Sequence, residues 1–238
     1  MRTISTGYDF RKDTNYDGRD PDQYSPTLRR YHKLLWSKKL PNGEDFILGD
    51  EKENYYLYCK VNDKEYSLSS DGIVHTYSHW KRTKHIIEKI PKDEIEYFYS
   101  LGETIGGFLI FPRNRVNNLD TINQDRGKNN FICDRIDLTL ECIRLYYKNK
   151  QSPLYKTLKR YDDFFKLFEN FKGYCEHFLM QDLLSDNFNS IRFMLPFKEF
   201  EWEPIPKTVE EYYAYKNNAI IFAQSRNNRI REYAEKNL

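Results

Sequence analysis

Three short runs rich in tyrosine, isoleucine and valine follow one another closely, at residues 45–49, 54–61 and 65–70. Such residues favour β-strands, and the asparagine, aspartate and glycine residues between the runs favour turns. Connections this short cannot hold the crossover that joins parallel strands. The sequence therefore predicts a small antiparallel sheet in this part of the chain, extended by a further strand at 73–80.

Helical periodicity and capping signals cover most of the remaining chain. A first helix is expected over 25–40, with Ser25 as its N-cap and Pro26 in its first turn. The last helix begins at the capping box of Thr208 and Glu211 and extends towards the C-terminus. Between them the sequence predicts helices at 92–101, 131–150, 152–171 and 174–184, and a buried strand or extended segment at 105–112.

These elements predict an α+β fold, with a small N-terminal antiparallel sheet packed on a larger helical body. No stretch resembles a linker, so residues 1–238 are expected to form one domain. Within it, 1–24 is a polar segment, 25–83 holds a helix and the strands, and 84–238 is mainly helical. The 20 tyrosines and 16 phenylalanines predict a core built on large rings.

Charge and hydropathy argue against a strongly basic, a membrane-spanning or a secreted protein. The 38 Lys and Arg residues nearly balance the 36 Asp and Glu residues, so any basic site must be local. No apolar run is long enough to cross a bilayer, and the first residues lack the hydrophobic region of a signal peptide. We therefore expect a cytoplasmic protein. Its cysteines form no CxxC pair and are expected to be small buried residues: Cys59, Cys133, Cys142 and Cys175.

Two patterns invite a search for bound metal. The stretch DTNYDGRD at 13–20 resembles the first half of a calcium loop that starts at Asp13. Tyr24 stands where that loop needs a bidentate glutamate, and Asx turns explain the same residues. His75 and His79 would lie too far apart on a strand to share one tetrahedral ion. Neither pattern by itself supports a metal site.

The segment 113–130 is predicted to be a long loop rich in arginine, asparagine and glutamine. These side chains hold anions and base edges through forked hydrogen bonds. Gly127 and Lys128 would lie just before the cap of the next helix, where free N–H groups suit a phosphate. The other parts of a P-loop are missing. We therefore expect a phosphorylated ligand to contact Asn123, Gln124 and Arg126.

Acidic residues form a stripe on the predicted helix at 131–150. Asp134, Asp137 and Glu141 recur at steps of three and four residues, between two apolar faces. Buried carboxylates need partners or a metal ion. In one interpretation they pair with arginines such as Arg135 and pin the helices together. In the other, they hold a divalent metal while arginines, Arg135 among them, clamp a phosphate; the first is favoured because ion networks are commoner than active sites.

The last helix carries two arginines, Arg226 and Arg229, which lie one turn apart and therefore on one face. One interpretation is an anion site shared with the 113–130 loop. The other is a solvated helix end whose basic residues favour the negative pole of the dipole. The predicted site is thus a polar cleft formed by the 113–130 loop, the 131–149 helix and the C-terminal helix.

Several stretches resemble an uncharacterised bacterial domain family of unknown function. They are YSPTLRRYHKLLWSKKLPNG at 24–43, INQDRGKNNFICDRIDLTLECIR at 122–144 and RNNRI at 226–230. The resemblance implies a bacterial or phage-borne protein that is complete as a single domain. It supplies no catalytic residues.

Two functions follow as hypotheses. In the first, the cleft binds a phosphorylated ligand, a nucleotide or RNA, and metal-assisted phosphodiester hydrolysis is the reaction its residues would support. In the second, the chain is a non-enzymatic module that binds a partner protein through surface aromatics, and the same charged residues are structural salt bridges. Arg126→Ala separates the two hypotheses, because it abolishes binding in the first and strands buried carboxylates in the second.

Overall fold

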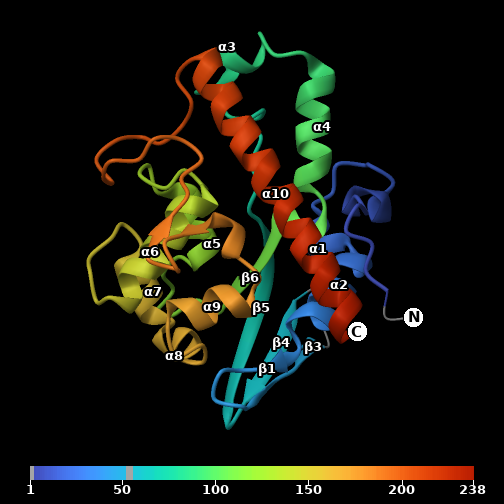
Figure 1. Cartoon of the computed structure of the whole chain (residues 1–238), viewed down its shortest axis with the longest axis vertical. Coiled ribbons are helices and arrows are strands. Elements are labelled where there is room, and N and C mark those ends of the chain that lie inside the picture. The colour runs from blue at the N-terminus through green and yellow to red at the C-terminus, as the bar shows by residue number, and fades with distance from the viewer. Residues whose placement is uncertain (1–2, 52–55) are drawn as a thin grey trace.

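A four-stranded antiparallel sheet lies at the centre of the computed structural model, which describes residues 3–51 and 56–238 (Figure 1). Its strands follow the order β3 (Leu48–Asp50), β4 (Leu57–Val61), β5 (Lys64–Gly72) and β6 (Phe108–Pro112). The α+β fold and its antiparallel sheet are as predicted. β6 confirms the expected extended segment at 105–112, and it pairs with β5 from Leu68 opposite Pro112 to Gly72 opposite Phe108.

The predicted strands differ from the structure at the edges of the sheet. The run at 45–49 is divided into β2 (Asp45–Phe46), which pairs with β1 (Lys38–Lys39), and β3. Residues 54 and 55 of the predicted run 54–61 lie outside the described part of the chain. The predicted strand at 73–80 is wrong, because the backbone leaves the sheet after Gly72 and turns at Tyr77, whose φ is 56°.

The N-terminal segment holds more regular structure than its polar composition predicts. It contains the 3-10 helix η1 (Phe10–Thr14) and the single turn α1 (Pro21–Tyr24), followed by α2 (Pro26–Trp36). Asp20 caps α1 by accepting a hydrogen bond from the N–H of Asp22. Ser25 caps α2 by accepting from the N–H of Leu28, as predicted. α1 thereby brings two aspartates beside the end of β5.

The long helix α10 (Val209–Asn237) crosses the molecule beside α4 (Lys92–Gly102), and both elements confirm predicted helices (Figure 1). Thr208 caps α10 as expected. The short η2 (Ile105–Gly107) packs directly against α10, where the N–H of Gly106 donates to Oδ1 of Asn227 at 2.8 Å. A Cβ at Gly106 would lie 2.6 Å from the carbonyl oxygen of Ala223, so glycine is required for this close approach.

Short helices lie on the opposite side of the sheet from α1 and α2 in Figure 1: α5 (Ile122–Lys128), α6 (Ile136–Tyr147), α7 (Tyr155–Arg160), α8 (Asp162–Lys166) and α9 (Phe171–His177). The prediction of a structureless loop at 113–130 is wrong, because Thr121 and Gln124 form a capping box that opens α5. Gly127 and Lys128 therefore lie at the end of a helix and not before one.

The other predicted helices are shorter than expected. The helix at 131–150 begins only at Ile136, since Cys133 and Asp134 have positive φ values of 47° and 62°. The helix at 152–171 is divided into α7 and α8, and α9 replaces the first part of the one at 174–184. The remaining elements are α3 (Lys84–Ile87), η3 (Gln181–Leu183) and the pair β7 (Leu184–Ser185) and β8 (Ser190–Ile191).

The predicted aromatic core is confirmed. One hydrophobic cluster contains residues from Phe10 to Ile230, and many of its members are phenylalanine and tyrosine. All four cysteines are buried and unpaired within the described residues, as expected of small core residues. No helix in the described ranges has both the length and the apolar character needed to cross a membrane.

Candidate functional site

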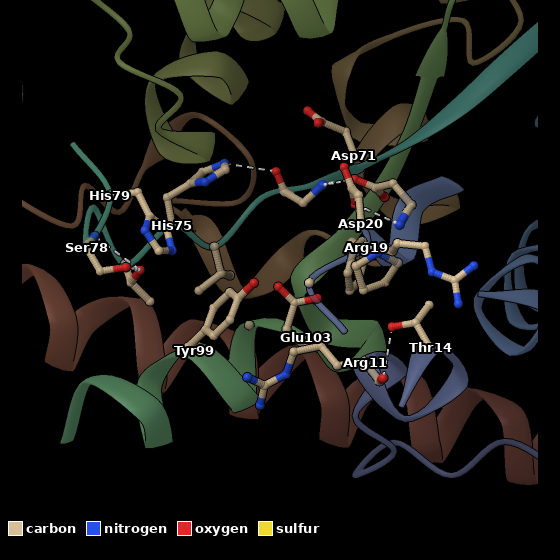
Figure 2. Close-up of a pocket in the computed structure, with 18 of the residues that line it drawn as sticks. Arg11, Thr14, Arg19, Asp20, Asp71, His75, Ser78, His79, Tyr99 and Glu103 are labelled. Atoms are coloured by element: carbon tan, nitrogen blue, oxygen red, sulfur yellow. Dashed lines mark hydrogen bonds between the residues drawn. The ribbon is translucent and has the colours of Figure 1, made fainter. Parts of the chain in front are cut away.

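Two pockets adjoin one another where α1, the end of β5 and the segment after it meet. The first, here called the histidine pocket, has a volume of about 560 Å³ and is drawn in Figure 2. The second, the arginine pocket, has a volume of about 520 Å³. Three carboxyl groups line both pockets: Asp20, Asp22 and Asp71. We call this shared wall the acid junction.

The remaining walls of the two pockets differ in chemistry. The histidine pocket is lined by Arg11, Tyr16, Arg19, His75, His79, Trp80, Tyr99 and Glu103, among others. In Figure 2, Glu103 lies between Tyr99 and Arg11, with Asp20, Arg19 and Asp71 across from it. The arginine pocket is lined mainly by hydroxyl, amide and guanidinium groups, including Ser69, Ser70, Arg113, Asn114, Arg115, Thr121, Asn123 and Gln124.

The acid junction is held by the contact between α1 and β5. Asp22 stands in the first turn of α1, and its Oδ2 accepts a hydrogen bond from the N–H of Gly72 at 3.1 Å. Its Oδ1 is buried, and no described residue is placed with the distance and angle of a hydrogen bond to it. Asp71 is the penultimate residue of β5, so the sheet fixes its backbone. Two carboxyls from distant parts of the sequence therefore share one wall.

A buried arginine supports Asp71 from behind. Arg126 of α5 has no exposed side-chain surface and forms an ion pair with Asp71. It also donates to Oγ1 of Thr139 at 3.3 Å and to the carbonyl oxygen of Asp134 at 2.9 Å. The carboxylate of Asp134 lies 3.2 Å from Nε2 of His75, which lines the histidine pocket. The network thus connects α5 to Asp71 of the acid junction and, through Asp134, to His75 of the histidine pocket.

Glu103 follows the last residue of α4 and adds a further, partly buried carboxyl to the histidine pocket. Its Oε2 is buried without a hydrogen-bond partner in the described part of the chain. Arg11 favours the charged form of Glu103, but that guanidinium is already paired with Asp9 at 2.6 Å and with Glu96 at 2.9 Å. A buried polar atom without a partner is costly, so Glu103 is a group that a ligand would satisfy.

Burial raises the pKa values of these carboxyls by different amounts. Desolvation, followed by repulsion from Asp71 and Asp20, holds the pKa of Asp22 well above its usual range. Desolvation raises the pKa of Asp71 to about 6, and Arg126 limits the rise. Desolvation raises the pKa of Glu103 to about 8, although Arg11 opposes it. At neutral pH the site therefore holds an ionised carboxylate, Asp71, and a protonated carboxyl, Glu103.

The arginine pocket offers cationic and amide groups. Arg113 stacks on the ring of Tyr56, with its guanidinium carbon 3.4 Å from the ring centroid, and lies 3.6 Å from Glu51. Arg115 is exposed and forms no ion pair with any residue that the structure describes. Nδ2 of Asn123 donates to Oγ of Ser69 at 3.1 Å, while its Oδ1 is buried and unpaired. The pocket can therefore contact both an anion and a hydroxyl group.

Part of the predicted site adjoins these pockets. Asn123 and Gln124 line the arginine pocket, although Oε1 of Gln124 is used to accept from the N–H of Thr121. Arg126 and Asp134 lie behind the acid junction as described above. The structure thus brings together the residues predicted near the start of α5, but around a wall of carboxyls that comes from other elements.

The other predicted residues lie elsewhere and have protein partners. Arg135 and Asp137 form a buried ion pair; Arg135 also donates to the carbonyl oxygen of Pro204, and Asp137 accepts from the N–H of Met194. Glu141 pairs with Arg144 at 2.7 Å. Arg226 is fully buried and donates to the backbone carbonyl oxygens of Gly106, Phe108, Phe178 and Leu179. Arg229 pairs with Asp182 at 2.8 Å.

Metal ligation has little support in the geometry. No group of three histidine, cysteine or acidic side chains within the described ranges is arranged to hold a metal ion. In the DTNYDGRD stretch, Asp13 accepts hydrogen bonds from Tyr8, Ser25 and Thr27, at 2.6, 2.5 and 3.0 Å. Asp13 therefore ties η1 to the start of α2.

Comparison with known proteins identifies the family. A family described as "Family of unknown function (DUF6994)" matches residues 4–230. The chain belongs to this family. All residues that line the two pockets fall within the range matched to DUF6994. No curated protein and no solved structure matches the chain. Membership confirms the predicted resemblance to a domain family of unknown function, and it transfers no activity.

Sequence reasoning missed the acid junction and Glu103. Asp71 has the sequence context of a turn, and Asp22 and Glu103 carry no local motif. The three residues are brought together by α1, the end of β5 and the end of α4, and no spacing in the sequence reports such contacts. One signal was present: the capping sequence of Asp20 followed by Pro21 predicts a helix start, and α1 places Asp22 at the site.

Proposed function

We propose that the chain binds a phosphorylated sugar, free or as part of a nucleotide, across the two pockets and hydrolyses it by acid–base catalysis. The observation that carries the proposal is a set of three partly buried carboxyls, Asp22 and Asp71 at the acid junction and Glu103 in the histidine pocket, whose pKa values are raised to different extents. Pairs of carboxyls with separated pKa values are how acid and base roles are divided in hydrolases. Pockets of this size suit a small molecule better than a polynucleotide.

The two roles follow from protonation. Glu103, with a pKa of about 8, is protonated at neutral pH and serves as the general acid. Asp71, with a pKa of about 6, is ionised and serves as the general base. A water molecule gives a proton to Asp71 as its oxygen bonds to the phosphorus atom of the ester. The bond from phosphorus to the leaving oxygen breaks as that oxygen takes the proton of Glu103.

The arginine pocket supplies the phosphate contact. Arg115 has no acidic partner within ion-pair distance among the described residues, and Arg113 is stacked on Tyr56 and pairs with Glu51 at 3.6 Å. Guanidinium groups bind phosphate through paired hydrogen bonds. The unpaired Oδ1 of Asn123 is an acceptor, and a sugar hydroxyl is a donor that would satisfy it. This retains the predicted class of ligand and moves its position from the cleft of the 113–130 loop, the 131–149 helix and the C-terminal helix to α1 and β5.

The first test is a thermal-shift panel of ribose 5-phosphate, glucose 6-phosphate and nucleoside monophosphates against ribose and glucose. A ligand at roughly one hundred times its Kd should raise the free energy of unfolding by about 2.7 kcal/mol. Arg115→Ala should remove the response to the phosphorylated compounds. Arg192→Ala, a substitution of another exposed arginine, is the matched control. Equal responses to phosphorylated and unphosphorylated sugars contradict the proposal.

The second test separates binding from chemistry. Glu103→Gln should keep the thermal response and lose hydrolysis of a chromogenic phosphate monoester, because glutamine cannot donate a carboxyl proton. Glu235→Gln, at an exposed glutamate of α10, is the control that should keep both. Hydrolysis that survives in Glu103→Gln contradicts the assigned general acid. A glycoside with the same chromophore reports whether the site prefers a glycosidic bond.

One observation favours a second function, a module that binds a partner protein. Phe131 and Trp202 expose 42% and 69% of their surface, and Phe131 lines an open groove of about 730 Å³ together with Phe197 and Phe200. If this surface carries the function, Phe131→Ala abolishes partner binding. Neither the wild type nor any variant then responds to sugar phosphates.

We infer a cytoplasmic location. The four cysteines are buried and unpaired, which is the usual state of thiols in a reducing compartment.

A further inference from the structure

A chain of hydrogen bonds runs from the core to Ser70, beside the acid junction. Nε1 of Trp36 donates to Nδ1 of His32 at 2.9 Å, and both side chains are fully buried. Nε2 of His32 lies 2.9 Å from Oγ of Ser70. Ser70 lines the arginine pocket, and its side chain interacts with Asp22. A serine next to a histidine resembles a nucleophilic pair, so the direction of these bonds decides what Ser70 can do.

The indole of Trp36 fixes that direction. An indole nitrogen can only donate, so Nδ1 of His32 must accept. Burial, followed by the charge of Arg226, lowers the pKa of His32 to about 3, which keeps the imidazole neutral. A neutral imidazole with an accepting Nδ1 carries its proton on Nε2 and donates it to Oγ of Ser70. A nucleophilic serine needs an imidazole that accepts its proton, so His32 cannot activate Ser70.

The hydroxyl proton of Ser70 is then left free for another acceptor. Oδ1 of Asp22 is buried and lacks a geometric hydrogen-bond partner among the described residues. We infer that His32 and Ser70 are positioning residues, which direct the Ser70 hydroxyl onto Asp22 and orient that carboxyl at the acid junction. This inference rests on the proposed function of the junction. We name the connection the Trp36–His32–Ser70–Asp22 relay.

The groups around Asp22 explain why such a donor matters. Asp71 and Asp20 repel its charged form, as does Glu103 once it ionises, while the Ser70 hydroxyl favours it. A hydrogen bond to a carboxylate lowers its pKa, and the loss of that bond raises it. Ser70 therefore sets how readily Asp22 ionises when a ligand enters either pocket.

The relay is tested by NMR on the ligand-free protein. Long-range proton–nitrogen spectra report the tautomer of His32, and carboxyl carbon shifts of Asp22 are followed against pH. We expect a neutral His32 protonated on Nε2. Ser70→Ala should move the titration of Asp22 upward by roughly 0.5–1 pH unit. Ser70→Thr retains a hydroxyl and should restore it, and Ser69→Ala, on the same strand, should leave it unchanged.

Two results overturn the inference: a His32 protonated on Nδ1, or an unchanged titration of Asp22 in Ser70→Ala. Where Trp36→Phe folds, it adds a check. Loss of the indole donor frees the tautomer of His32, so Asp22 should titrate at a higher pH, as in Ser70→Ala. The spectra need no ligand, so they test the relay by itself. A silent sugar phosphate panel with an intact relay overturns only the proposed function.

Discussion

Arg126, which has no exposed side-chain surface, forms an ion pair with Asp71, a carboxyl that lines both pockets. The pair joins α5 to the end of β5. Arg126 was predicted to bind ligand. It lies behind the pocket wall, and its charge limits how far burial raises the pKa of Asp71.

Arg126→Ala should destabilise the fold strongly. It leaves Asp71 and Asp134 without their buried cation, and breaking such a pair costs roughly 3–5 kcal/mol. Urea denaturation measures the loss. Lys128→Ala, at the end of the same helix, removes an exposed pair with Asp120 and should cost far less. Equal small losses in both variants contradict the structural role of Arg126.

Glu103→Gln should change how stability depends on pH. The pKa of Glu103 is about 8 in the folded chain against an ordinary value of 4.5, so its contribution is complete below pH 4.5 and is lost as the pH rises towards 8. Glutamine has no such dependence. As the pH rises from 4.5 to 8, the free energy of unfolding of the variant should therefore increase relative to that of the wild type, by up to about 1.4 kcal/mol for each pH unit. Denaturation midpoints at several pH values report the gain, and parallel curves contradict it.

His177→Leu should flatten the acid limb of the same curve. The ring packs edge-on against Phe46, Phe168 and Phe178, and burial lowers its pKa to about 3 from 6.5. Its contribution is complete above pH 6.5 and is lost as the pH falls towards 3. The observable is the free energy of unfolding at stepwise lower pH.

Gly106→Ala should loosen the contact between η2 and α10. The new methyl carbon would meet the carbonyl oxygen of Ala223 at 2.6 Å and the side chain of Asn227 at 2.8 Å. Overpacking of this kind costs about 1–3 kcal/mol. Gly7→Ala meets no atom within 4 Å and is the control. A thermal midpoint for Gly106→Ala equal to that of the control rules out the tight packing.

Local signals in the sequence anticipated much of the fold. Ser25 and Thr208 mark helix starts because capping depends on neighbouring residues alone. The turn at 131–135 was missed because Cys133 and Asp134 adopt positive φ despite helical periodicity. α5 was missed because the polar residues of 113–130 favoured a loop, although Thr121 and Gln124 held a capping box.

The site was harder to anticipate than the fold. Charged residues along a helix, such as Asp137 of α6 and Arg229 of α10, suggest a cleft, but in the structure they pair with Arg135 and Asp182. The carboxyls of the pockets come from elements that meet only after folding, as the bond from Gly72 to Asp22 shows. Long-range contacts of this kind leave no period or spacing in a single sequence.

The most direct test of the central claim is a titration of isotope-labelled protein with ribose 5-phosphate, followed by NMR. We predict saturable shifts at the backbone amides of Arg115 and Asn123 and at the carboxyl carbons of Asp22, Asp71 and Glu103. Ribose should produce much smaller shifts at the same concentration. Shifts confined to the groove around Phe131, or no saturable shift at either pocket, would contradict a sugar phosphate site at the acid junction.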